Sequence, residues 1–226
     1  MIPVDPVDLT SSAPFDPISY YLHISVGMVG LLAALIALST KKGSRVHIIA
    51  GRSFAASILV VAVSSLVLLS VRMAPPLLVA ALTSVYAVGT ALLALKPATR
   101  RVRTCETGLF IFEIGVVLLF LSFAIPQVAA GNIPLIGPLA ILAIPIILLA
   151  GDVHFFRNAD RRAALRIRRH LARMIWAFAI AVRAPLAEVY SQLEIPIPFI
   201  SIGPLIVAPM LIAVFLPRYP IASQPR

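Results

Sequence analysis

Four histidines are the residues whose chemistry is most informative in this chain of 226 residues. A neutral imidazole ring can ligate zinc or haem iron through one of its nitrogens. The four side chains, His23, His47, His154 and His170, are scattered along the sequence. The chain has no H-E-x-x-H or C-x-x-C-H motif, and its single cysteine excludes a cysteine-based zinc cluster. A shared histidine site would therefore have to be assembled by the fold.

The composition indicates the class of that fold. Hydrophobic residues make up 60% of the chain and charged residues only 12%, whereas soluble domains are about a quarter charged. Continuous apolar runs of about 20 residues are typical of membrane-spanning helices, while the strands of a membrane barrel are shorter and alternate in polarity. We therefore predict an all-α, polytopic membrane helix bundle.

Seven apolar segments are long enough to be the helices of this bundle. They cover residues 18–39, 47–71, 75–95, 107–128, 134–156, 171–190 and 195–216. Together they define a seven-helix transmembrane domain over residues 18–217. Residues 1–17 lack the basic start and the cleavage pattern of a signal peptide. We interpret them as an extracytoplasmic flexible tail, and residues 218–226 as a cytoplasmic tail.

Basic residues lie in alternate connections between the predicted helices, at 41–45, 96–103 and 157–169, and again at the C-terminus. By the positive-inside rule these connections face the cytoplasm, so the N-terminus is outside and the C-terminus inside. The net charge of +10 then indicates contact with anionic lipid headgroups rather than with nucleic acid. The basic stretch around 157–174 predicts a sixth helix that begins early, partly in the headgroup layer; a partner-docking surface is the alternative.

Ionisable side chains inside a bilayer are costly, and they often mark functional sites. Six of them are expected near the cytoplasmic face: His47, His154, His170, Asp152, Arg52 and Arg173. A hydrolytic zinc site would use His47 and His170, with Asp152 or His154 as the third ligand. Asp152 and His154 are two residues apart and point about 200° away from each other on a regular helix. At most one of them can therefore face the other two ligands.

The same layer could instead hold a haem, with His47 and His170 as its axial ligands. Arg52 and Arg173 would then lie near the propionates. Small residues follow both histidines on the same helix face, such as Gly51 four residues after His47, and they would leave room for a flat cofactor. The alternative is close helix packing, with each histidine hydrogen-bonded to a neighbouring helix.

A second polar group, His23, Arg183 and Glu188, is expected in the outer half of the bundle. These side chains could pair with one another. Arg183 could also bind an anionic headgroup, a quinone carbonyl or a substrate carboxylate, as part of a cofactor or ligand site.

Two stretches carry a resemblance to a known family. The first, LHISVGMVGLLAALIALSTKKGSRVHIIAGRSF, resembles the first two helices of an uncharacterised bacterial family of multi-pass membrane proteins, a domain of unknown function. The matching residues are His23, Lys42, Gly43, His47 and Gly51. Ile48 stands where that family has arginine. The second stretch, RRHLARMIWAFAIA, is similar to the family's later landmark through His170, Arg173 and Met174.

The resemblance covers about a third of the chain and implies a multi-pass protein of the bacterial plasma (inner) membrane, without an activity. In architecture the chain is also similar to di-haem membrane cytochromes and to seven-helix zinc hydrolases, by analogy alone. Our leading expectation is a histidine-based metal or haem site near the cytoplasmic face, with a redox or metal-dependent role. The alternatives are an accessory subunit of a larger membrane complex, a homo-oligomer interface included, or a small transporter.

Overall fold

A computed structural model describes residues 17–71, 73–192 and 198–219 of the chain. Within these ranges the chain forms α-helices and short 3-10 helices but no strand, so the all-α prediction is confirmed. The α-helices are α1 (Pro17–Ser39), α2 (Arg45–Val71), α3 (Pro75–Ala94), α4 (Arg100–Ala129), α5 (Ile136–Arg157), α6 (Arg162–Gln192) and α7 (Pro198–Phe215). The predicted tails, apart from Pro17 and residues 218–219, lie outside the described residues.

Two helices begin well before the predicted segments. α4 begins at Arg100 rather than at residue 107, because Thr99 caps it: the Thr99 hydroxyl accepts a hydrogen bond from the backbone N–H of Val102. α6 begins at Arg162 rather than at residue 171, as the early-start interpretation of the basic stretch predicts. The extra turns at the starts of α4 and α6 carry charged side chains, which therefore lie on helices of the bundle rather than in loops.

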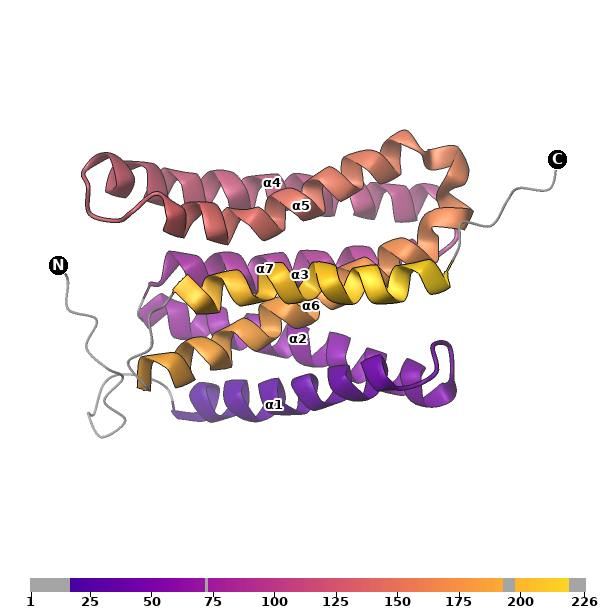
Figure 1. Ribbon diagram of the computed structural model, residues 1–226, viewed down its shortest axis with the longest axis horizontal. Coiled ribbons are helices and arrows are strands. Elements are labelled where there is room, and N and C mark those ends of the chain that lie inside the picture. The colour runs from indigo at the N-terminus through magenta and orange to yellow at the C-terminus, as the bar shows by residue number, and fades with distance from the viewer. Residues whose placement is uncertain (1–16, 72, 193–197, 220–226) are drawn as a thin grey trace.

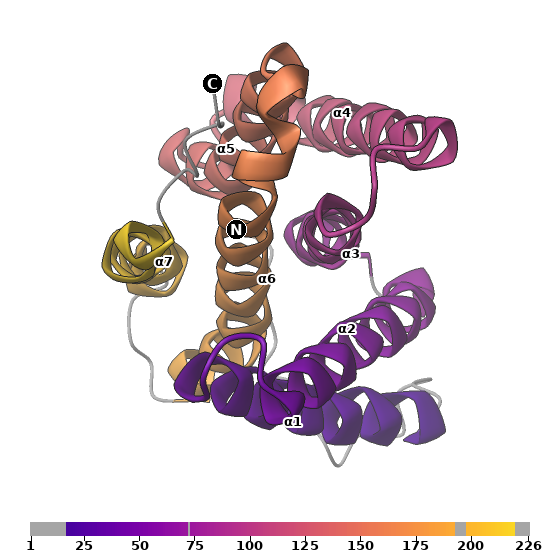
Figure 2. The same ribbon diagram turned by 90° about the vertical axis from the view of Figure 1, so that its right-hand side faces the viewer.

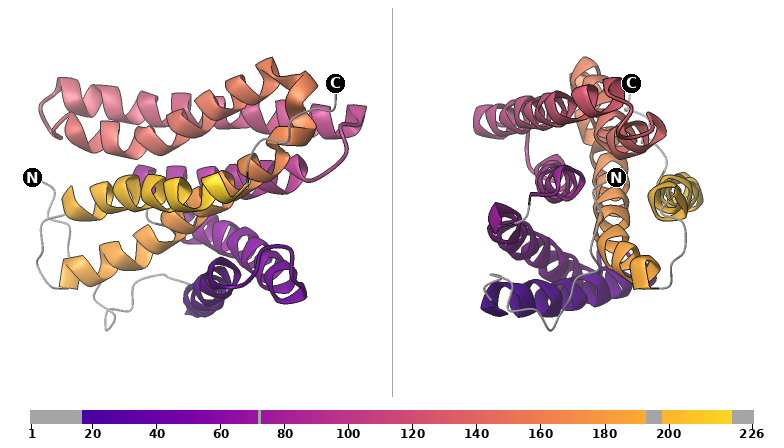
Figure 3. Two further views of the ribbon diagram at one scale, coloured as in Figure 1. Left: turned by 45° about the vertical axis from the view of Figure 1, so that its right-hand side comes forward. Right: turned by 90° about the vertical axis from the view of Figure 1, so that its left-hand side faces the viewer.

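The helices run alternately up and down the long axis of the molecule (Figure 1). Viewed from one end, α1 and α2 form one layer, α3, α6 and α7 lie in the middle, and α4 and α5 cover the other side (Figures 2 and 3). The α1–α2, α3–α4 and α5–α6 connections and the C-terminal end of α7 lie at the same end of the bundle (Figures 1 and 3). We call this end, which carries the basic connections, the basic end.

Five of the helices in the described part of the chain are long and apolar enough to cross a membrane, namely α1 to α5. These five helices are compatible with the predicted membrane helix bundle. α6 carries several arginines. The apolar helix Gly203–Arg218, which covers most of α7 and the 3-10 helix after it, is shorter than a full span. That all seven helices cross the bilayer, with the N-terminus outside, stays a prediction.

The core of the bundle lies where α3 and α6 pack together. Ala87 and Ala91 of α3 are fully buried there, as are Ile175 and Ala177 of α6. Small side chains let two helix backbones approach closely, which is how membrane helices gain packing contacts without a hydrophobic driving force from lipid. α3 and α6 therefore form the central pair, around which the charged side chains of α4, α5 and α6 are arranged.

Gly30 is where α1 packs most tightly on α2, and it provides a test of the fold. A Cβ atom added to Gly30 would lie 2.8 Å from Cβ of Ser57, whereas one added to Gly51 would meet no atom within 4 Å. We expect Gly30→Ala to cost about 1–3 kcal/mol through overpacking. Gly51→Ala should leave stability unchanged or slightly higher. Thermal unfolding in detergent checks this, and equal midpoints for the two variants would contradict the close packing of α1 on α2.

Candidate functional site

Two groups of polar side chains lie at or near the basic end of the bundle. The first, called here the histidine pair, is His47 of α2 and His170 of α6. The second, called the ionic cluster, consists of five charged side chains from α4, α5 and α6. Its members are Glu106, Asp152, Arg162, Arg169 and Arg173.

His47 lies in the first turn of α2 and closes the end of α1. Ser44 caps the start of α2, because its hydroxyl accepts a hydrogen bond from the His47 backbone N–H at 3.2 Å. The ring Nδ1 of His47 is 3.0 Å from the carbonyl oxygen of Ala37, one of the last carbonyls of α1, which have no partner within the helix. Lys42 donates to the same oxygen at 2.8 Å. Burial lowers the pKa of Lys42, and the charge of Arg218 acts in the same direction.

His170 has the same kind of contact on the other side of the pair. Its Nδ1 is 3.0 Å from the carbonyl oxygen of Ala91, in the last turn of α3. A carbonyl oxygen can only accept, so Nδ1 carries the hydrogen in both rings and Nε2 of each neutral ring keeps its lone pair. The carbonyls that the two rings contact lie near the ends of α1 and α3, both at the basic end of the bundle (Figure 1). Metal-ligating histidines are commonly held in this way, by a backbone carbonyl on the other ring nitrogen.

The ionic cluster joins α4, α5 and α6 through buried carboxylates. Glu106 accepts from Arg162 at 2.6 Å and from Arg169 at 2.5 Å. Asp152 accepts from Arg169 at 2.8 Å and from Arg173. The side chains of Glu106 and Asp152 are only 1% and 0% exposed. Each carboxylate thus binds two guanidinium groups, and Arg169 connects the two halves of the cluster.

Aromatic and backbone contacts complete the surroundings of the ionic cluster. The guanidinium of Arg169 lies 4.0 Å from the ring centroid of Phe155, and that of Arg173 lies 5.1 Å from the ring of Tyr86. The Tyr86 hydroxyl donates to Asp152 Oδ2 at 2.5 Å. These contacts supply cation–π stabilisation and fill the remaining acceptor sites of Asp152. Since Tyr86 belongs to α3, its hydrogen bond connects the ionic cluster to a fourth helix.

The structure keeps the predicted third metal ligands away from the histidine pair. Asp152 is buried and holds its arginines, while His154 is exposed, so the two residues face different sides, as their spacing predicts. No group of three or more His, Cys, Asp or Glu side chains in the described part of the chain could hold a metal ion. The zinc prediction gains no support, because the oxygens of Asp152 are already bound by Arg169, Arg173 and Tyr86.

The two arginines predicted to accompany a haem differ in position. Arg52 is exposed on α2. Arg173 is 3% exposed and donates to Asp152 and to the Leu148 carbonyl. Its place in the ionic cluster leaves little freedom to bind a propionate as well.

The residues expected in the outer half lie toward the other end of the bundle. His23 is half-buried on α1, and its Nδ1 is 3.0 Å from the Ser64 hydroxyl of α2. That hydroxyl donates to the Val61 carbonyl, so it accepts from His23. Arg183 is half-buried on α6 and takes part in an interaction there. The side chain of Glu188 lies outside the described side chains, so its pairing with Arg183 stays a prediction.

Sequence reasoning missed most of the ionic cluster. Glu106, Arg162 and Arg169 fall in turns that the predicted segments assigned to connections. A signal was present in the spacing: Glu106 and Glu113 are seven residues apart, and so are Arg162 and Arg169. Residues seven apart share a helix face, so two stripes of opposite charge could have been paired.

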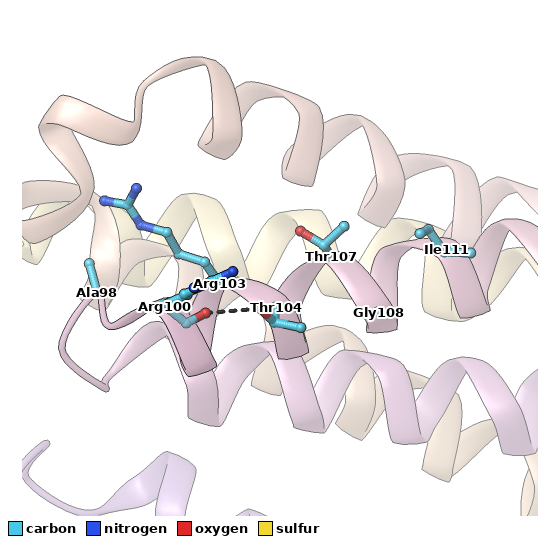
Figure 4. A pocket seen from close by; sticks show the side chains of 7 residues that line it. All are labelled: Ala98, Arg100, Arg103, Thr104, Thr107, Gly108 and Ile111. Carbon is cyan, nitrogen blue, oxygen red and sulfur yellow. Dashed lines mark hydrogen bonds between the residues drawn. The ribbon is translucent and has the colours of Figure 1, made fainter.

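A separate pocket lies at the start of α4 (Figure 4). It is lined by Ala98, Arg100, Arg103, Thr104, Thr107, Gly108 and Ile111. All of these residues come from α4 or from the connection before it, and the Thr104 hydroxyl donates to the Arg100 carbonyl at 3.1 Å. No residue of the histidine pair or the ionic cluster lines this pocket.

Comparison of the chain with protein-family models, with curated proteins and with solved structures finds no match.

Proposed function

We propose that this chain is an integral membrane protein that binds haem iron through the Nε2 atoms of His47 and His170. The observation that carries the proposal is the shared arrangement of the two rings. Each binds a backbone carbonyl near the end of a helix through Nδ1 at 3.0 Å, and those ends of α1 and α3 both lie at the basic end of the bundle (Figure 1). The two free Nε2 atoms, on different helices, are the ligands that a six-coordinate haem requires.

Haem fits this donor set better than zinc does. A catalytic zinc site needs about three protein ligands, and the described residues hold no group of three. Haem iron needs only two axial ligands from the protein. A bound haem would supply one-electron redox chemistry, and the two histidines would hold it between α2 and α6.

The basic end would face the cytoplasm of a bacterial cell, so the haem would lie near the inner surface of the plasma membrane. The resemblance to an uncharacterised membrane family agrees with this placement. An accessory subunit and a small transporter remain the competing functions, and neither requires an iron-binding histidine pair.

Haem binding is tested by adding haemin to the purified protein. We expect the absorbance spectrum of a low-spin, bis-histidine haem, with the sharp bands of that state on reduction. His47→Ala and His170→Ala should each lose this spectrum and weaken haemin binding by about tenfold or more. The measurement is a haemin titration followed by a reduced-minus-oxidised difference spectrum.

Two other histidines provide matched controls. His154→Ala removes an exposed ring, and His23→Ala removes a half-buried ring that is also hydrogen-bonded through Nδ1. Both variants should bind haemin as the parent protein does. A parent protein that shows no such spectrum, or a spectrum that survives in His47→Ala and His170→Ala, would overturn the proposal.

A further inference from the structure

Glu113 is a buried carboxyl that the ionic cluster and the histidine pair leave unexplained. It lies on α4 two turns beyond Glu106, on the same helix face, and it is 0% exposed. The Thr83 hydroxyl of α3 donates to its Oε1 at 2.7 Å. Its other oxygen, Oε2, has no hydrogen-bond partner among the described residues. A buried polar atom without a partner is uncommon in native proteins, and it calls for a physical explanation.

Arg173 has a matching unsatisfied donor. Its Nη2 binds Asp152 and the Leu148 carbonyl, but its Nη1 is buried and has no partner among the described residues. The charge of Arg173 acts on Glu113, and so does the charge of Asp152. The groups that interact with Glu113 therefore come from three helices: Thr83 of α3, Asp152 of α5 and Arg173 of α6.

The charges in this region are one short of balance. The ionic cluster holds three arginines and two carboxylates, which leaves one positive charge if Glu113 is protonated and none if Glu113 is ionised. An apolar environment favours the neutral form of a carboxyl, whereas a nearby guanidinium and a donated hydrogen bond favour the charged form. Glu113 experiences both influences, which oppose each other. The free-energy difference between its protonated and ionised forms is therefore smaller than for a carboxyl that is subject to only one of the two influences.

We propose that Glu113 and Arg173 form a proton-binding site in the interior of the bundle. Glu113 takes up one proton from hydronium on its free Oε2, which releases one water molecule, and it gives the proton back in the reverse step. When the proton leaves, Arg173 and the Thr83 hydroxyl stabilise the carboxylate. The site lies deeper in the bundle than Glu106, and it does not depend on the proposed haem.

Infrared spectroscopy of the protein in lipid nanodiscs tests this site. As the pH is lowered, a protonated carboxyl produces a C=O stretching band that shifts slightly in D₂O. We expect one such band that is present in the parent protein and lost in Glu113→Gln. Asp160→Asn, which removes an exposed carboxyl, should keep the band. A parent protein without a titrating buried band, or a band unchanged in Glu113→Gln, would overturn the proposal.

A second variant keeps the test decisive if Glu113→Gln does not fold. Thr83→Val removes the hydroxyl that donates to Oε1 and preserves the size of the side chain. The band should persist in Thr83→Val with a shifted frequency and a shifted titration midpoint, because its carboxyl has lost that hydrogen bond. If neither the frequency nor the midpoint moves, the titrating carboxyl is not Glu113. The fluorescence of Trp176, the only tryptophan in the chain, reports whether each variant is folded.

Discussion

Replacing Asp152 by alanine is expected to cost about 3 to 5 kcal/mol of folding free energy, the range for removing one partner of a buried ion pair. The carboxylate is 0% exposed and binds Arg169 and Arg173. Its loss leaves Arg173 with the Leu148 carbonyl as its remaining hydrogen-bonded partner among the described residues. The Tyr86 hydroxyl loses its acceptor as well. The unfolding midpoint in detergent, followed by Trp176 fluorescence, measures the effect.

Asp152→Asn and Asp160→Ala separate the causes of this loss. The asparagine keeps an acceptor oxygen and nearly the same volume but removes the charge, so its cost should fall between those of the parent and Asp152→Ala. Asp160 is exposed in the short helix before α6, and its replacement should change the midpoint very little. If Asp152→Ala were as stable as Asp160→Ala, the ionic cluster would contribute nothing to the fold.

Replacing Arg169 by alanine should be the other strongly destabilising change, at about 3 kcal/mol. Arg169 is 8% exposed and is the only member of the cluster, as described, that binds both carboxylates. Its cost falls at the low end of the range because Arg162 still binds Glu106 and Arg173 still binds Asp152. The change should show as a lower unfolding midpoint and as easier proteolysis of the α5–α6 connection.

Two substitutions test whether the geometry of Arg169, and not charge alone, is responsible. Arg169→Lys keeps the charge but cannot donate to two carboxylates from one planar group, so it should recover only part of the lost stability. Arg166→Ala removes an exposed arginine one turn away and should be near neutral. If Arg169→Lys were as stable as the parent protein, the hydrogen bonds from one guanidinium group to both carboxylates would not be needed for stability.

Much of the fold could be predicted because hydropathy and charge are local properties of the sequence. The seven segments predict seven helices, and the described helices α1, α2, α3 and α5 begin within two residues of the predicted starts. The starts of α4 and α6 could not be found from hydropathy, because the first turns of these helices are charged. In the sequence, the arginines and Glu106 of these turns are typical of a solvated connection. Only the tertiary structure shows that they pair with a neighbouring helix.

The candidate site was predicted only in part. His47 and His170 were expected at the same end of the bundle, and the carbonyls that they contact, near the ends of α1 and α3, do lie at that end (Figure 1). Their partners, the carbonyls of Ala37 and Ala91, could not be inferred, because a backbone carbonyl carries no sequence signal. The third ligand was misjudged for a related reason: Asp152 was treated as free, since nothing in its own segment reveals the two arginines that bind it.

By itself the sequence determined the helical class, the membrane character and the end of the bundle where basic side chains gather. Each of these properties depends on residue types within a window of about 20 residues. Only the tertiary structure decided which side chains meet. Arg162 and Glu106 are 56 residues apart, and their contact depends on how α4 and α6 are rotated about their axes. Rotation and crossing angle result from packing between helices, which no single segment encodes.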